Sequence, residues 1–211
     1  MSYSDFPYRL YLVVSDADCK HHTIDYVVEE AILGGVDLIQ LREKHIDKET
    51  FVRKAIQIKS ITDKYKVPLI INDVVDVAIE IEAWGVHVGR SDMPPSEIYK
   101  LPNCPKHIGW SLELLEQLNS SELNFVHHLG ISPVFASKTK RDTITNWGVD
   151  GIQTIRQKTD LPLVAIGGID ETNIQDVVRA GTHCVAVVSA ICGSENPRLV
   201  AQNLKRLIYQ A

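Results

Sequence analysis

Basic and amide side chains occupy alternate positions in the segment Q-L-R-E-K, which runs from Gln40 to Lys44. An apolar run precedes this segment, and successive side chains of a β-strand point to opposite faces. If Leu41 packs into the core, Gln40 and Arg42 point the other way, and Lys44 can join them. Grouped cations bind phosphate and diphosphate through charge-assisted hydrogen bonds. The segment therefore indicates an anion site, although a solvated loop with an Arg–Glu ion pair is an equally good interpretation.

Two aspartates follow neighbouring apolar runs further along the chain. Asp73 comes directly after the run that ends at Asn72, and Asp92 lies in the next loop, G-R-S-D-M-P-P. Carboxylates from adjacent loops can share a Mg²⁺ ion, which completes its shell with water and substrate phosphate oxygens. The competing interpretation is structural, because aspartate often caps a helix and Asp92 precedes two prolines that suit a helix start.

Hydroxyl and basic side chains gather again in a long polar loop that begins at Pro133. Ser137 and Thr139 carry hydroxyls there, and Lys140 follows them. These side chains are a second set of anion-binding candidates. An ordinary surface loop would have the same composition.

Two of the last apolar runs end in residues that suit a phosphate-binding loop. Gly167 and Gly168 end one run, and Val188-Ser189 ends the next, where we expect a short helix to begin. Backbone N–H groups at a helix start bind phosphate, and glycine lets the backbone approach a ligand closely. A tight turn without a ligand is the alternative.

The elements that must position these residues follow from the pattern of the whole chain. Apolar runs rich in β-branched residues alternate with amphipathic segments. We expect strands over Leu10–Val14, Val36–Leu41, Pro68–Asn72, Gly85–Val88, His107–Ser111, His128–Ser132, Leu163–Ile166 and Cys184–Val188. We expect helices over Thr23–Leu33, Lys48–Tyr65, Val74–Ala83, Pro95–Lys100, Leu112–Leu118, Val149–Lys158, Glu171–Ala180 and Asn196–Tyr209.

Repeated alternation of strand and helix is typical of a closed parallel barrel. A doubly wound open sheet shares the alternation, but no G-x-G-x-x-G follows the first expected strand. We therefore predict the α/β class and a single (β/α)8 TIM barrel, with residues 1–211 forming one domain. In such barrels the active site lies at the C-terminal ends of the strands, where the polar residues above are expected.

Composition limits the kinds of partner that the chain can have. The formal net charge is −5 and no basic face is evident, so we expect no nucleic-acid binding. No apolar run approaches the roughly 18 residues that span a bilayer, and no signal peptide is evident, so we expect a cytoplasmic protein without membrane contact. The four cysteines form no C-x-x-C pair, which gives no support to a disulfide framework or structural zinc.

Several motifs taken together resemble the thiamine phosphate synthase family, and the resemblance covers nearly the whole chain. They occur in the family's order and spacing: Q-L-R-E-K, I-N-D, H-V-G-x-x-D-M-P, G-x-S, P-V-F-x-x-x-T-K, A-I-G-G-I and A-V-V-S-A-I. The resemblance implies a transferase of thiamine biosynthesis. Its small-molecule substrates would be 4-amino-2-methyl-5-hydroxymethylpyrimidine diphosphate and a thiazole phosphate, and its products thiamine phosphate and diphosphate.

The resemblance also implies roles for individual residues. Asp73 and Asp92 would hold Mg²⁺, the implied cofactor, and Lys44, Lys140 and Ser111 would be catalytic. The pyrimidine diphosphate would be bound by Gln40, Leu41, Arg42, Glu43, Lys44, Asn72, Ser111 and Lys140. The thiazole phosphate would be bound by Ser137, Lys138, Thr139, Gly168, Val188 and Ser189.

The implied reaction begins with departure of diphosphate, which leaves a pyrimidine-stabilised methylene cation for the thiazole nitrogen to capture. Mg²⁺ and the two lysines would neutralise charge on the leaving group. The chain departs from the family pattern at a few positions: Ser132, Ala136, Ser137, Glu113 and the pair His127-His128. These departures bear on substrate tuning more than on the reaction.

Two other functions are compatible with parts of the pattern. A thiazole tautomerase would keep the Gly-Gly and Val-Ser phosphate site, but it has no need of a metal–diphosphate site. A non-catalytic regulator that binds thiamine precursors would have no need of the complete set of cations and carboxylates. The sequence leaves open whether the chain forms a homo-oligomer and which thiazole phosphate it prefers.

Overall fold

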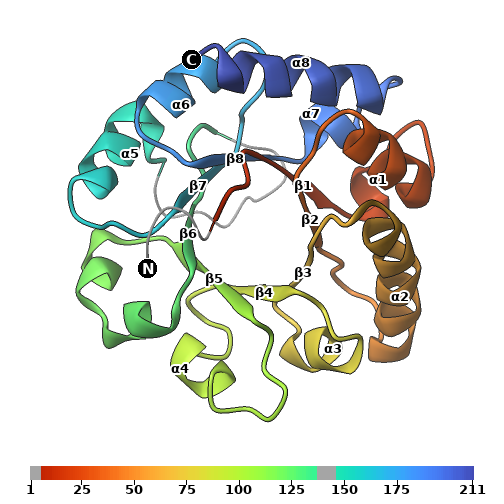
Figure 1. The fold of residues 1–211 in the computed structure, drawn as a ribbon. Helices are drawn as coiled ribbons and strands as arrows, with labels where there is room; N and C mark the ends of the chain where they lie inside the picture. Colours follow the sequence, from red (N-terminus) through yellow and green to blue (C-terminus); the bar gives the residue numbers. More distant parts are fainter. Residues whose placement is uncertain (1–5, 137–145) are drawn as a thin grey trace.

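The protein folds into a closed barrel of parallel strands surrounded by helices (Figure 1). The structure is a computed structural model and describes residues 6–136 and 146–211. Neighbouring strands pair in chain order, and β8 returns to pair with β1. The strands are β1 (Leu10–Val14), β2 (Leu38–Leu41), β3 (Leu69–Asn72), β4 (Gly85–Val88), β5 (His107–Leu112), β6 (His128–Ile131), β7 (Leu163–Ile166) and β8 (Cys184–Val187). The predicted (β/α)8 TIM barrel is confirmed.

Helices cover the outside of the barrel, and their apolar faces bury the outward side chains of the strands. They are α1 (Ile24–Leu33), α2 (Lys48–Tyr65), α3 (Val75–Glu80), α4 (Pro95–Ile98), α5 (Gly148–Arg156), α6 (Ile174–Arg179), α7 (Ser189–Cys192) and α8 (Pro197–Tyr209). Short 3-10 turns occur at η2 (Asp16–Asp18), η3 (Leu115–Asn119) and η4 (Ser121–Phe125). Within the described residues, no helix is long and apolar enough to cross a bilayer.

The predicted helix over Leu112–Leu118 is wrong. Strand β5 continues to Leu112, and the segment after it forms the two 3-10 turns η3 and η4. The buried amide of Gln117 explains the difference. Its oxygen accepts from the backbone N–H of Glu113 at 2.8 Å, and its nitrogen donates to the Ser111 carbonyl at 3.0 Å. These side-chain bonds offer the backbone after β5 an alternative to the hydrogen bonds of an α-helix.

The interior of the barrel is divided into an apolar and a polar side. Strands β1 to β3, β7 and β8 contribute a compact inner cluster that includes Tyr11, Val13 and Ile70. Strands β4 to β6 instead contribute histidine, serine and glycine at alternate positions, so that Ser111 and His128 are buried polar residues. The polar side lies below one part of the barrel mouth and supplies groups for chemistry.

The bottom of the barrel, at the N-terminal ends of the strands, is tied together by Asp37. Its carboxylate accepts hydrogen bonds from the backbone N–H groups of Arg9 at 2.8 Å and Leu10 at 3.0 Å, where β1 begins. The same carboxylate forms an ion pair with Lys205 of α8. One partly buried side chain therefore joins the first strand, the approach to the second and the last helix.

We expect Asp37→Ala to lower the free energy of unfolding by about 2–3 kcal/mol, because hydrogen bonds to a charged group each contribute about 1.5–3 kcal/mol. Urea titration followed by circular dichroism measures the change. The matched control is Asp63→Ala, which removes the i,i+4 pair with Lys59 on α2. Such surface pairs contribute less than about 1 kcal/mol. Equal losses in the two variants would show that Asp37 is an ordinary surface charge.

Candidate active site

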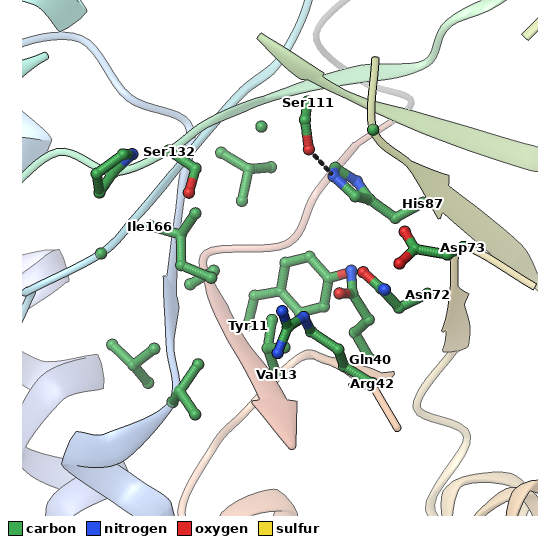
Figure 2. Close-up of a pocket in the computed structure, with 18 of the residues that line it drawn as sticks. Tyr11, Val13, Gln40, Arg42, Asn72, Asp73, His87, Ser111, Ser132 and Ile166 are labelled. Carbon is green, nitrogen blue, oxygen red and sulfur yellow. Dashed lines mark hydrogen bonds between the residues drawn. The ribbon is translucent and has the colours of Figure 1, made fainter. Parts of the chain in front are cut away.

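A cavity of about 380 Å³ lies at the C-terminal ends of the strands. Most of the predicted site residues that the structure describes line it, and they come from strands on every side of the barrel (Figure 2). They are Gln40, Arg42, Lys44, Asn72, Asp73, Asp92, Ser111, Gly168, Val188 and Ser189. The predicted residues Ser137, Lys138, Thr139 and Lys140 lie outside the described residues.

Two of the predicted ligand-binding residues point their side chains away from the cavity. Leu41 is completely buried in the core between strands and helices, because it holds the outward position between Gln40 and Arg42. The carboxylate of Glu43 accepts from Lys54 of α2 at 2.7 Å and from the backbone N–H of Asp16 at 3.0 Å. Neither side chain lines the cavity, and a contact of either residue with the diphosphate stays a prediction.

Gln40 is held in place by a tyrosine that the sequence interpretation missed. The Nε2 group of Gln40 donates to the hydroxyl of Tyr11 at 2.6 Å, and both side chains are buried at the cavity wall. Burial raises the pKa of Tyr11 well above its usual 10, so the hydroxyl stays protonated. Tyr11 stands in an apolar strand, and its alternation with Val13 toward the interior was the available signal.

Asp73 and Asp92 come together at the cavity, as predicted. Asp73 follows β3 directly with a left-handed φ of 62°, and the Asp92 carboxylate accepts from the Gly89 backbone N–H at 2.7 Å. The N-cap positions of α3 and α4 are Val74 and Pro94. The helix-cap interpretation of the two aspartates is therefore wrong.

The two carboxylates strongly perturb each other. Burial is the largest cause that raises the pKa of Asp73 to about 6, and the negative charge and hydrogen bond of Asp92 contribute in the same direction. Lys44 and Arg42 act in the opposite sense, which places positive charge in the same part of the cavity. Unless a further cation is bound, the Asp73 carboxyl therefore loses its proton only at a higher pH than an ordinary aspartate.

This arrangement fits a Mg²⁺ ion. Among the described residues, no group of three or more histidines, cysteines and acids gathers into a metal site. Mg²⁺ commonly takes only one or two protein carboxylates and leaves its other positions to water and substrate phosphates. A divalent cation between Asp73 and Asp92 would also remove the repulsion that raises the Asp73 pKa.

Glycine at positions 167 and 168 is explained by the backbone conformation and by close packing. Gly167 and Gly168 have φ values of 107° and 64°, which other residues rarely adopt. A Cβ atom on Gly168 would lie 2.8 Å from Cβ of Phe135 and 2.9 Å from the carbonyl oxygen of Ala136. Glycine is thus required by the backbone and by the loop after β6. The expected short helix is present as α7, and Val188 and Ser189 line the cavity beside the glycines.

Further polar residues reach the cavity without having been predicted to do so. Arg90 and Glu113 form an ion pair of 3.5 Å at its edge. His87 and His128 line its floor, and Nε2 of His87 lies 3.0 Å from the Ser111 hydroxyl. Their signal was the alternation along β4 and β6, which places these histidines on the inner face.

Comparisons with known proteins agree with one another. The family model described as thiamine monophosphate synthase matches residues 10–191. A thiamine-phosphate synthase of Vibrio campbellii is 43% identical over 201 residues, covering 95% of this chain and 98% of the relative. One of Albidiferax ferrireducens is 42% identical over 200 residues, covering 95% and 91%. A solved thiamine phosphate pyrophosphorylase of Pyrococcus furiosus superposes with a TM-score of 0.86 at 28% identity, covering 97% and 96%.

The raised pKa of Asp73 makes a prediction about stability and pH. Folding favours the protonated carboxyl, so ionisation destabilises the metal-free protein as the pH rises from about 4 through about 6. We expect Asp73→Asn to have a higher Tm than wild type at pH 7.5 in EDTA, and the difference to vanish below about pH 4. Asparagine also accepts the left-handed φ.

Thermal unfolding at several pH values measures this difference. The control is Asp76→Asn, an exposed position in the first turn of α3, which should show no such dependence on pH. An equal Tm difference for Asp73→Asn at low and neutral pH would mean that the carboxylate pair imposes no penalty.

Proposed function

This chain belongs to the thiamine monophosphate synthase family, and we propose that its cavity binds a pyrimidine diphosphate and a thiazole phosphate together and joins them. The chain is an enzyme, a transferase that forms thiamine phosphate. The proposal assigns each substrate and the metal to particular residues of the cavity.

One observation carries this assignment: cations and paired carboxylates share one wall of the cavity. Arg42 and Lys44 follow β2, and Asp73 follows β3 beside Asp92. A free anion would be repelled by the carboxylates, and a free metal ion by the cations. A metal–diphosphate complex would satisfy both sets at once, because the carboxylates would hold the metal and the cations would bind the phosphate oxygens.

The pyrimidine ring is assigned to the amide and hydroxyl groups beside this wall. Gln40, Asn72 and Ser111 line the cavity at the ends of β2, β3 and β5. Gln40 donates to Tyr11, so its amide orientation is set before a ligand arrives. Such fixed hydrogen-bonding groups suit an aminopyrimidine, which carries both donors and acceptors.

The thiazole phosphate is assigned to the opposite side of the mouth. Gly168, Val188 and Ser189 belong to the loops after β7 and β8, where barrels frequently bind a phosphate. Ser137, Lys138 and Thr139 would complete this site from the loop after β6. The side chain of Ile166, at the end of β7, also lines the cavity (Figure 2).

The residues would act on the reaction by binding and charge neutralisation. As the carbon–oxygen bond breaks, its electron pair leaves with the diphosphate, and the thiazole nitrogen supplies the pair for the new carbon–nitrogen bond. Arg42, Lys44 and Lys140 would stabilise the charge that grows on the diphosphate. A bound Mg²⁺ would act as a Lewis acid toward the same oxygens. Holding the two rings side by side supplies the remaining advantage, and no side-chain nucleophile is needed.

The two alternative functions gain no support. The named relatives are synthases, and the carboxylate pair lies next to the cations where a diphosphate site requires it. A tautomerase or a regulator would have no leaving group for these charges to stabilise.

The metal assignment is tested by the formation of thiamine phosphate from both precursors. We expect EDTA to abolish product and Mg²⁺ to restore it. Asp73→Ala and Asp92→Ala should each lower kcat by roughly 100-fold or more, because several kcal/mol of charge stabilisation are lost. Asp76→Ala is the matched surface control. If both active-site variants kept full activity per folded molecule, the carboxylates would not hold the metal.

Lys140 tests the assignment of the leaving group. The charge that it would neutralise grows in the transition state, so Lys140→Ala should lower kcat as well as raise KM for the pyrimidine diphosphate. One such contact contributes roughly 2–4 kcal/mol, or about 30- to 1000-fold in rate. Lys158→Ala, an exposed lysine just beyond α5, controls for loss of a positive charge. An unchanged kcat at saturating Mg²⁺ would remove Lys140 from the mechanism.

A further inference from the structure

A chain of hydrogen-bonded imidazole rings runs through the barrel beneath Ser111. Nε2 of His87 lies 3.0 Å from the Ser111 hydroxyl, and Nδ1 of His87 lies 3.2 Å from Nε2 of His128. Nδ1 of His128 lies 2.7 Å from Nε2 of His107. Figure 2 shows the first of these links as a dashed line. The chain thus leads from the cavity floor to the beginning of β5, deep in the barrel.

Glycines in the neighbouring strands make room for these rings. Gly109 stands in register between His87 on β4 and His128 on β6. A Cβ atom at Gly109 would lie 2.1 Å from Cε1 of His128 and 2.5 Å from Nδ1 of His87. A Cβ atom at Gly130 would lie 2.9 Å from Cε1 of His87. Glycine weakens a strand interior, so its use at these two places indicates that the ring contacts are specifically accommodated.

Aromatic side chains enclose the lower part of the chain. The ring of Phe6 lies 5.5 Å from that of His107 and 5.3 Å from that of His128. Trp84 stacks on His107 at 4.2 Å, and His128 is completely buried. Burial lowers the pKa of His107 to about 2 and that of His128 well below 6.5. Both rings are therefore neutral at physiological pH.

Neutral rings in direct contact must choose their tautomers together. A neutral imidazole has one N–H donor and one acceptor nitrogen, so each link of the chain needs one hydrogen from one side. When His87 is neutral as well, these three links allow two complete arrangements. In one, His87 donates to the Ser111 oxygen, and in the other, Ser111 donates to His87. Which of the two groups donates in the hydrogen bond between Ser111 and His87 is thus coupled to the tautomers of His128 and His107.

We propose that His128 and His107 are positioning residues for the pyrimidine diphosphate, which act through His87 by holding the Ser111 hydroxyl and setting its hydrogen-bond direction. The inference rests on the proposed function, which places Ser111 against the pyrimidine. An aminopyrimidine offers an amino donor beside a ring-nitrogen acceptor. A serine of fixed position and matched direction binds it better than a freely rotating one.

A double-mutant cycle tests this coupling. We expect Ser111→Ala and His128→Leu each to raise KM for the pyrimidine diphosphate roughly 3- to 10-fold, as loss of one hydrogen bond implies. KM for the thiazole phosphate should stay unchanged. The double variant should be no worse than Ser111→Ala alone, because His128 acts only through that hydroxyl. His128→Gln, which keeps a donor and an acceptor, should recover part of the loss.

The outcomes separate the inference from the function on which it rests. If His128→Leu raises KM equally with and without Ser111, its effect is general and the positioning role is wrong. If Ser111→Ala leaves KM unchanged while product still forms, the placement of Ser111 is wrong and the inference fails with it. His127→Asn is the control. His127 contacts His107 at 5.0 Å between ring centres but bonds the Ile108 backbone, so both KM values should remain those of wild type.

A second measurement works on the native chain and does not depend on the folding of a His128 variant. The ring nitrogens of ¹⁵N-labelled histidine report tautomers directly in NMR spectra. We expect the pyrimidine diphosphate to shift the His128 ring resonances in wild type, and the shift to be lost in Ser111→Ala. Unmoved His128 resonances at saturating ligand would overturn the coupling.

Discussion

Two carboxylates that approach each other away from bulk water repel, and Asp73 and Asp92 do so at the mouth of this barrel. The repulsion, together with burial, keeps the Asp73 pKa near 6. A protein gains no stability from such a pair, and Arg42 and Lys44 relieve it only in part. We propose that a divalent cation bound together with a diphosphate offsets this cost, because both sets of charges would then be satisfied.

The barrel holds these charged side chains at its mouth with an interior that has an apolar side and a polar side. Apolar side chains from β1 to β3, β7 and β8 form the inner cluster that supports the mouth from below. On β4 to β6, glycines replace bulky residues, and histidine rings occupy the space. The rigid apolar side fixes the strand ends that carry the charges. The polar side provides a serine whose hydroxyl contacts the ring of His87, which in turn contacts the buried ring of His128.

Much of this could be predicted from the sequence, because alternation of apolar runs determines both strands and inward positions. The strand ends and the residues Gln40, Arg42 and Asp73 follow from that rule. The side chains of Leu41 and Glu43 point away from the cavity because alternation along the strand turns every second residue outward. The histidine chain could not be foreseen, since it depends on contacts between strands whose residues are distant in sequence. The Gln117 amide bonds nearby backbone groups, which the pattern of apolar residues does not reveal.

The Asp73 carboxyl itself gives the most direct test of the central claim, that this carboxylate pair exists to hold a metal ion. Its ¹³C resonance can be titrated by NMR in EDTA and again with saturating Mg²⁺ and inorganic diphosphate. We expect a pKa of about 6 without metal and a much lower value with it. An ordinary pKa near 3.8 without metal, or a raised pKa that Mg²⁺ leaves unchanged, would contradict it.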